Sequence, residues 1–192
     1  NPGCYPTCSI LALAPFVRLL DPALGVFIDA KSGVSGAGKA LKTSSHFVSV
    51  NENAGAYSPI SHRHADEIKE QLQILKGGEF STLFVPNLLP ITRGMLVSAF
   101  GVLQKSVDAE AVLREFYANE PFVRVRSEPV SIKNIAGTHF CDIFVKTAGD
   151  KIWINSAIDN LLRGASSQAV ANANLMCGFA EATALPRIAH GI

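Results

Sequence analysis

Cys4 is the residue of this 192-residue chain whose type and position most clearly suit chemistry. It follows Gly3 and lies where apolar residues begin to recur at three- and four-residue spacing, so it should open a helix with Pro6 in the first turn. The unpaired N–H groups and the dipole of a helix N-terminus favour a thiolate, and a lowered thiol pKa is what a cysteine nucleophile needs. The competing interpretation is an ordinary buried cysteine, because most lone cysteines are structural.

A second chemical group is the tripeptide His62-Arg63-His64, which directly precedes a predicted helix. Asp66 and Glu67 lie in the first turn of that helix. A histidine at this place could transfer protons as a general acid or base, and the carboxylate of Glu67 could hold its ring. Taken alone, however, the segment is better interpreted as a solvated basic tripeptide.

Cys8 lies one helical turn after Cys4, so the two thiols could bind a metal or form a redox pair. No second Cys/His pair with zinc spacing accompanies them, so we predict no metal site and expect Cys8 to be a small core residue. The loop over residues 32–38 is rich in glycine and serine and resembles an anion-binding nest. It lacks the lysine of a P-loop, and the chain has no GxGxxG fingerprint, so a flexible surface loop is the alternative.

Arg93 precedes Gly94 and lies between two predicted strands. An arginine there could clamp a carboxylate or a phosphate in its fork, and a plain surface charge is at least as compatible with the pattern. His139 precedes a buried-looking strand, and we assign no role to His46 or His190.

The elements that must position these residues are mixed helices and strands, with most strands in the middle of the chain. This order predicts an α+β fold, with a mixed, largely antiparallel sheet covered by helices and one long helix near the C-terminus. That last helix is rich in alanine, glycine and serine, so another backbone can approach it closely. Helices are predicted over residues 4–20, 65–75, 108–117 and 159–184, and strands over residues 25–30, 46–50, 80–85, 95–103, 122–125, 140–146 and 151–154.

Composition argues against several classes of protein. Hydrophobic residues are 48% and charged residues 17% of the chain, so there is ample material for a core and no case for disorder. A formal net charge of +1 suggests neither a nucleic-acid partner nor an acidic membrane surface. No apolar run reaches the roughly 18 residues of a membrane span. Four cysteines are too few for a disulfide scaffold, which favours a reducing compartment, and the missing initiator Met suggests a fragment or a processed product.

Taken together, these motifs resemble the N-acetyl-gamma-glutamyl-phosphate reductases. The opening Asn-Pro-Gly-Cys-Tyr-Pro-Thr matches the active-site signature of that family, and the resemblance runs nearly to the end of the chain. Two departures are Cys8, where a small residue such as alanine is expected, and Asp66, where a proline is more usual. The further matching stretches, in the same order as in the family, are residues 29–38, 62–64 with 67–68, 93–94, 140–143, 159–165 and 168–170.

The resemblance implies a fold similar to the C-terminal domain of glyceraldehyde-3-phosphate dehydrogenase. Residues 1–157 would form the catalytic and dimerisation domain. Residues 158–192 would form a helix that packs on an N-terminal Rossmann domain, and that domain is absent from this sequence. The isolated chain is therefore expected to be inactive and to bind NADPH weakly.

The implied chemistry is the NADPH-dependent reduction of N-acetyl-gamma-glutamyl phosphate to the semialdehyde, a step of arginine biosynthesis. Cys4 would attack the acyl phosphate to form a thioester. His64, slightly favoured over His62 because of its spacing from Glu67, would be the acid and base. Arg93 would bind the substrate carboxylate or phosphate. The weaker assignments are cofactor contacts by Ser35, Gly36, Gly38 and Asn160.

The expected setting is a cytoplasmic homo-oligomer, either a dimer or a tetramer, or an organellar one if the source is a eukaryote. Its partner is a small-molecule acyl phosphate, with no nucleic acid or membrane involved. Three alternatives remain open. The chain could come from a lysine-pathway aminoadipyl-phosphate reductase or an aspartate-semialdehyde dehydrogenase, or it could act only as a dimerisation or interaction module.

Overall fold

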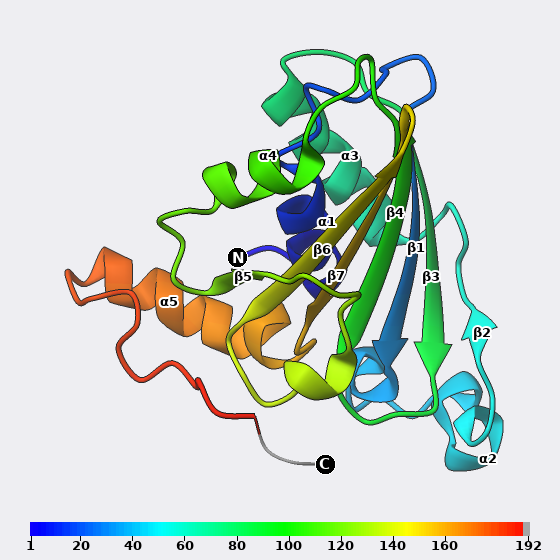
Figure 1. The fold of residues 1–192 in the computed structure, drawn as a ribbon. Helices are drawn as coiled ribbons and strands as arrows, with labels where there is room; N and C mark the ends of the chain where they lie inside the picture. Colours follow the sequence, from blue (N-terminus) through cyan, green and yellow to red (C-terminus); the bar gives the residue numbers. More distant parts are fainter. Residues whose placement is uncertain (190–192) are drawn as a thin grey trace.

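A seven-stranded sheet is the framework of the fold, as a computed structural model shows over residues 1–189 (Figure 1). Its strands are β1 (Val26–Gly33), β2 (Gly55–Ala56), β3 (Thr82–Leu89), β4 (Met95–Val102), β5 (Val123–Val125), β6 (Cys141–Ala148) and β7 (Lys151–Ile158). They lie in the order β2-β3-β1-β4-β7-β6-β5. The pairs β1–β3 and β5–β6 are parallel, and the other four pairs are antiparallel. The predicted α+β class, with a mixed and largely antiparallel sheet, is confirmed.

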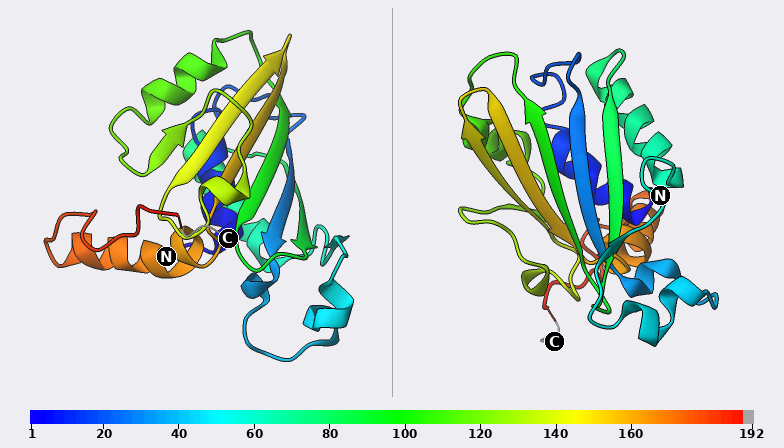
Figure 2. Two further views of the ribbon diagram at one scale, coloured as in Figure 1. Left: turned by 60° about the horizontal axis from the view of Figure 1, so that its bottom comes forward. Right: turned by 90° about the vertical axis from the view of Figure 1, so that its right-hand side faces the viewer.

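Helices cover one face of this sheet and leave much of the other bare (Figure 2). Within residues 1–189 the α-helices are α1 (Cys4–Leu13), α2 (Phe47–Val50), α3 (Arg63–Lys76), α4 (Ala109–Phe116) and α5 (Ser167–Met176). Helix α1 packs on β4 and β7, α3 packs on α1 and β3, and α4 packs on β6. In the described part of the chain, no helix has the length and apolarity needed to cross a membrane.

The two-residue periodicity of the strands explains which face is covered. In β1, Val26, Ile28 and Ala30 point towards the helices and are almost fully buried. Phe27 lies between them on the opposite face, and its side chain is 55% exposed. Phe100 of β4 pairs with Phe27 across the strands and is 47% exposed on the same face. The uncovered face of the sheet is therefore apolar over its central strands.

Helix α1 is shorter than the predicted 4–20 because Pro15 cannot continue it. A proline has no N–H to donate, and its ring clashes with the carbonyl four residues earlier, which here is that of Leu11. That carbonyl accepts instead from the hydroxyl of Tyr117, at 2.5 Å. Turns follow α1 as far as Leu20, which forms a bridge to Leu103 beside the sheet.

The predicted strand over residues 46–50 is wrong, because this segment forms the single helical turn α2. Its apolar side chains Phe47 and Val48 are 78% and 88% exposed, so they belong to no core face. The edge position beside β3 is taken by β2 instead. A short apolar run does not distinguish a strand from a helical turn, which explains the error.

The predicted helix over residues 159–184 is also wrong in its extent. A π-helical turn over Leu162–Ser166 precedes α5, which ends at Met176. Gly178 has a left-handed φ of 76°, and the N–H of Phe179 turns back to the carbonyl of Asn174 at 2.8 Å. Asn174 then fixes the returning chain by donating to the carbonyls of Glu181 and Thr183. The sequence beyond α5 therefore forms turns rather than helix as far as the described residues reach.

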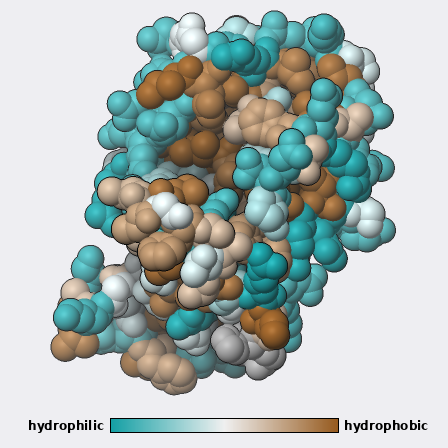
Figure 3. All heavy atoms as spheres, turned by 90° about the vertical axis from the view of Figure 1, so that its left-hand side faces the viewer, coloured by the Kyte–Doolittle hydropathy of each residue, from teal (hydrophilic) through white to brown (hydrophobic). Residues whose placement is uncertain are grey.

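Helix α5 projects from the body of the molecule and is largely apolar on its outer surface. Viewed from that side, the projecting part shows much hydrophobic surface beside a hollow (Figure 3). The exposed apolar side chains are Val170, Leu175 and Met176 of α5 and Phe179 just after it. The inner side of α5 packs through Ala171 on a small core that includes Phe122 and Leu185.

Candidate active site

Cys4 is the first residue of α1, as predicted, and lies next to two glycines, Gly3 and Gly164, that make close contacts. A Cβ added to Gly3 would lie 2.4 Å from Nε2 of His64, and one added to Gly164 would lie 2.7 Å from the Cβ of Cys4. Only the absence of side chains at these two positions lets α3 and the π-helical turn approach Cys4 so closely. The structure thus places Cys4 against the turn that leads into α5, directly after Gly3, the residue that the His64 ring touches.

Burial is the main influence on the Cys4 thiol. Partial burial raises its pKa, while the N–H groups of Tyr5 and of Cys4 itself lower it; the charge of Arg63 lowers it further and that of Glu67 raises it. The net shift is upward, so the expected lowering of the thiol pKa by the helix N-terminus is wrong for this chain. Desolvation outweighs the helix N–H groups here. A base must therefore take the thiol proton before the sulfur can act as a nucleophile.

His64 is the candidate for such a base. Its side chain is only 8% exposed and lies against Gly3, directly ahead of the thiol. Burial, followed by the charges of His62 and Arg63, lowers its pKa to about 4, so the ring is neutral at neutral pH. Its Nδ1 is buried and has no hydrogen-bond partner among the described residues.

His62 has a structural contact that the sequence did not suggest. It is the N-cap of α3, and its Nδ1 accepts from the N–H of His64 at 3.1 Å. Its ring also packs edge-on against Tyr5 and Tyr57, with centroids 5.7 and 5.4 Å away. The two histidines therefore occupy different places: the His62 ring packs against Tyr5, whereas the His64 ring lies against Gly3, directly before Cys4.

Glu67 contacts the backbone ahead of the thiol rather than a histidine ring. Its Oε1 accepts from the N–H of Gly3 at 3.1 Å, and no hydrogen bond between Glu67 and His64 is found within the described residues. The carboxylate thus fixes the entry of the chain into α1. It positions Cys4, whereas the sequence suggested that it would hold the ring of a histidine.

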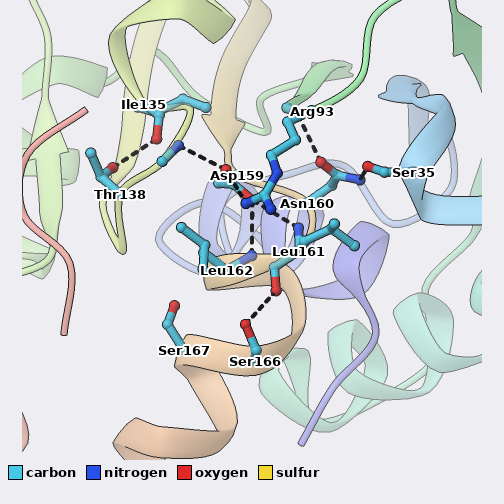
Figure 4. Close-up of polar contacts among 12 residues, drawn as sticks. Ser35, Arg93, Ile135, Thr138, Asp159, Asn160, Leu161, Leu162, Ser166 and Ser167 are labelled. Atoms are coloured by element: carbon cyan, nitrogen blue, oxygen red, sulfur yellow. Dashed lines mark hydrogen bonds and ion pairs between the residues drawn. The ribbon is translucent and has the colours of Figure 1, made fainter. Parts of the chain in front are cut away.

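Arg93, expected at the substrate, and Ser35 and Asn160, expected at the cofactor, come together around a residue that the sequence did not single out (Figure 4). Asn160 accepts from the N–H of Gly94 at 2.7 Å and donates to the hydroxyl of Ser35 at 3.0 Å. Asp159 is fully buried and accepts from the N–H groups of Gly137, Leu161 and Leu162 at 2.8 to 2.9 Å.

The guanidinium of Arg93 lies 3.8 Å from the Asp159 carboxylate and is 41% exposed. That separation is too long for a hydrogen bond, so the donors of Arg93 remain available to an anion.

The glycines of the loop after β1 differ in their surroundings. A Cβ on Gly36 would approach the Oγ of Ser32 at 3.2 Å and the Nδ2 of Asn160 at 3.4 Å, so the backbone at Gly36 lies beside Asn160 and the residues around it. Gly38 has a left-handed φ of 77° with open space around it, so the structure does not bring it to the other residues.

Cys8 is a core residue, as predicted. It is fully buried, and burial raises its thiol pKa to about 12. Its sulfur lies 3.2 Å from the hydroxyl of Ser156, which also donates to the Cys8 carbonyl. No cluster of three or more metal-ligating side chains occurs in residues 1–189.

Three residues near the site were missed by the sequence reasoning: Asp159, Arg163 and His139. Asp159 and Arg163 lie within the 159–165 segment that carried the family resemblance, so the signal was present there without a role attached to it. His139 was noted only as preceding a strand, and nothing in its sequence neighbourhood predicts its contact with Arg163.

Comparison with known proteins gives a consistent picture. The family model for the semialdehyde dehydrogenase dimerisation domain matches residues 4–160. An N-acetyl-gamma-glutamyl-phosphate reductase of Campylobacter hominis is 71% identical over 192 residues, which are 100% of this chain and 57% of that protein. Its counterpart in Wolinella succinogenes is 58% identical over 99% of this chain and 56% of the relative. The chain thus spans somewhat more than half the length of the curated relatives it matches.

Solved structures agree at the level of the fold. Aspartate semialdehyde dehydrogenase II from Vibrio cholerae superposes with a TM-score of 0.71 over 93% of this chain and 62% of that one, at 15% identity. The enzyme from Francisella tularensis gives 0.68 over 92% and 64%, at 14% identity. The predicted resemblance to the C-terminal domain of glyceraldehyde-3-phosphate dehydrogenase is confirmed.

The four free thiols should differ in their reactivity towards iodoacetamide. Cys177 is exposed and should react first, Cys4 second, and the buried Cys8 and Cys141 only after unfolding. In a Cys177→Ser variant, the rate at Cys4 should keep rising above pH 9, the ordinary pKa of the thiol, because burial raises it. Peptide mass mapping measures this, and a rate that levels off near neutral pH would contradict the raised pKa.

The stability of the chain should depend on pH through His64. Its pKa is about 4 when folded and about 6.5 when unfolded, so the unfolded chain takes up the proton first as the pH falls. The contribution of His64 to stability is therefore present above pH 6.5 and is lost as the pH falls towards 4. Urea unfolding should show a smaller loss for His64→Gln over this range, and a ring titrating near 6.5 by NMR would refute the assignment.

Proposed function

Because the chain belongs to the semialdehyde dehydrogenase family, matched through its dimerisation domain, we propose that it is the catalytic part of an N-acetyl-gamma-glutamyl-phosphate reductase. The observation that supports this most is Cys4 at the head of α1, directly after Gly3, against which the ring of a neutral, buried histidine lies. Relatives of that name, 58% to 71% identical, align with essentially the whole of this chain.

The proposed reaction begins with proton transfer from the Cys4 thiol to neutral His64. The sulfur attacks the acyl phosphate carbonyl, the bond to the phosphate oxygen breaks, and a thioester and free phosphate result. Reduction of the thioester carbon gives a thiohemiacetal, whose oxygen is protonated by His64. On its collapse the carbon–sulfur bond breaks and the hydroxyl proton passes by way of His64 to the sulfur, which releases the semialdehyde and regenerates the Cys4 thiol. The fork of Arg93 binds the phosphate group, and Glu67 keeps the Gly3–Cys4 backbone in place.

The loop after β1 fits the edge of a nicotinamide cofactor. Gly36 leaves its backbone bare beside Asn160, and Ser35 fixes the amide of Asn160 by a hydrogen bond. When bound, NADPH would supply the hydride to the thioester carbon. Gly38, with nothing near its Cα, would lie at the outer end of this surface.

Site variants in the intact, two-domain enzyme test this mechanism. Cys4→Ala should lower kcat by on the order of 10⁴-fold or more, and His64→Ala by about 10²- to 10⁴-fold. His62→Ala removes a helix cap and should cost about 1 kcal/mol of stability with a smaller effect on kcat. Cys8→Ala is the matched control and should retain turnover.

The readout is oxidation of NADPH by N-acetyl-gamma-glutamyl phosphate, followed by absorbance. Full turnover in both single histidine variants would refute the acid–base assignment. Faster reduction of aspartyl or carrier-bound aminoadipyl phosphate would point to one of the alternative substrates.

The uncovered sheet face supports assembly with a second copy. The matched family model is a dimerisation domain, which indicates that the chain oligomerises. The bare face carries Phe27 and Phe100 around a shallow, mainly apolar cavity of about 370 Å³. An apolar patch of this kind on a soluble domain marks an interaction site. We propose that the same face of a second chain covers it, in a dimer or a tetramer.

Sedimentation should separate this interface from other apolar surface. Phe100→Asp should shift the chain to monomer, because a carboxylate would be buried without a partner. Phe116→Asp on α4 is the matched control, since Phe116 is similarly exposed, at 53%, on the helix-covered side of the sheet. Equal oligomeric states for the two variants would argue against the sheet face.

The projecting α5 supports docking of a nucleotide-binding half. We propose that residues 158–192 pack on that half through the exposed Leu175, Met176 and Phe179; residues 190–192 and the unassigned His190 lie outside the described residues. Calorimetry on this chain alone should then show NADPH binding weaker than micromolar, whereas micromolar affinity would count against the proposal that the other half of the enzyme binds the nucleotide.

The four free thiols fit a reducing compartment, so we propose a cytoplasmic location.

A further inference from the structure

A cavity of about 500 Å³, lined by both polar and apolar side chains, lies between α1, α3 and the start of α5. Arg163 and Gln168 line one side, and Glu67 and Gln71 of α3 line another, with Thr7 of α1 between them. Arg163 directly precedes Gly164, whose Cα is packed against Cys4. The cavity therefore reaches, at Arg163, the residue next to the one that contacts Cys4, although Cys4 itself is not among its lining residues.

Arg163 is a buried cation on which the charges of Glu181 and Glu120 act, but it forms no direct ion pair among the described residues. Its side chain is only 8% exposed, and no ion pair to a carboxylate is found for it within residues 1–189. Its Nε has no hydrogen-bond partner among residues 1–189. A buried charge is costly unless it is paired, so a cation that lines a cavity without a direct ion pair indicates an anionic ligand.

The protein partner of Arg163 orients the guanidinium without neutralising it. Arg163 Nη1 donates to Nε2 of His139, so His139 must accept there and carry its proton on Nδ1. Nδ1 lies 2.6 Å from the hydroxyl of Ser167, which accepts that proton. His139 is fully buried, and burial lowers its pKa to about 3, so it is neutral. The guanidinium of Arg163 is thereby held in place by a neutral partner, and Glu181 and Glu120 compensate its charge only from beyond ion-pair distance.

The other walls of the cavity determine what kind of anion fits. Glu67 is an acceptor on the opposite side, and a simple inorganic anion would be repelled by it. Gln71 and Gln168 offer amide donors and acceptors. The pattern suits a ligand with a carboxylate at one end and an amide N–H a few bonds away.

We propose that Arg163 binds the α-carboxylate of an N-acylated amino acid, with the acylamide N–H directed towards Glu67, and that it is therefore a specificity-determining residue. This inference rests on the proposed function for the identity of the substrate. It leaves Arg93, on the Asp159–Asn160 side of Cys4, for the phosphate group. The two arginines would hold the two charged ends of one substrate across the nucleophile.

Titration calorimetry of the chain with N-acetyl-L-glutamate tests the proposal. Arg163→Gln should weaken binding by about 10- to 100-fold, the usual effect of losing a hydrogen bond between charged groups. Arg163→Lys keeps the charge but not the fork and should give an intermediate loss. Arg114→Gln is the matched control, because Arg114 is exposed and, among the described residues, pairs with Glu110 of its own helix. The Arg114→Gln variant should bind N-acetyl-L-glutamate as tightly as the unchanged chain does.

A pair of isomeric probes makes the test independent of how the variants fold. N-acetyl-L-glutamine keeps the α-carboxylate and should bind nearly as well as N-acetyl-L-glutamate. N-acetyl-L-isoglutamine carries its carboxylate on the side chain instead and should bind at least about tenfold more weakly. Equal binding of the two isomers, unchanged affinity in Arg163→Gln, or no binding of any probe at millimolar concentration would overturn the proposal.

The outcome is separable from that of the proposed function, because the binding measurement needs neither the cofactor nor turnover. If the intact enzyme reduced a different acyl phosphate, discrimination between the isomers by Arg163 would still stand. If the isomers bound equally while N-acetyl-gamma-glutamyl phosphate was reduced, only the role of Arg163 would fail.

Discussion

The Asp159 carboxylate is the interaction on which the arrangement of the site depends. Burying a charge without partners would cost several kcal/mol, and three backbone N–H groups with the nearby Arg93 offset that cost. These partners come from the loop before β6, from the turn after β7 and from the loop before β4. One side chain therefore fixes where three separate segments meet, and the position of Asn160 follows from it.

Close backbone contact then completes the site. Gly3 and Gly164 bring a histidine and a turn against Cys4 at distances that any side chain would prevent. Such contact excludes water and so raises the pKa of the Cys4 thiol, while it lowers that of His64. The pair is therefore neutral at rest, as thiol and imidazole, and charge is created only when the proton moves between them. This differs from a site in which a helix N-terminus keeps a thiolate permanently ionised.

Local patterns in the sequence predicted much of this architecture, and the errors have physical causes. The start of α1 at Cys4, the helix α3 after His62 and the hairpin β6–β7 all follow from periodicity, caps and a turn glycine. Residues 46–50 were misassigned because apolar residues at an exposed loop tip imitate a buried strand. The predicted C-terminal helix is too long because Gly178 ends it through a left-handed turn, and a single glycine in the sequence does not by itself indicate such a turn.

Contacts between residues far apart in the sequence limited how much of the site could be predicted. Residue types and family resemblance located Cys4, His64, Arg93, Ser35 and Asn160. They could not show that Glu67 would contact Gly3, that His62 would cap a helix, or that His139 would orient Arg163. Each of these contacts joins residues whose proximity is decided by tertiary packing, or, for His62, by the rotamer of one ring.

The parallel pairing of β1 with β3 carries a kinetic consequence. The connection from Gly33 to Thr82, which includes α3 and therefore His64, must be in place before these two strands can pair. Loop-closure entropy delays such pairings relative to hairpins such as β6–β7. Cys4 and His64 would thus be brought together late in folding, so partially folded chains would carry a Cys4 thiol without the burial that raises its pKa and without the neighbouring imidazole.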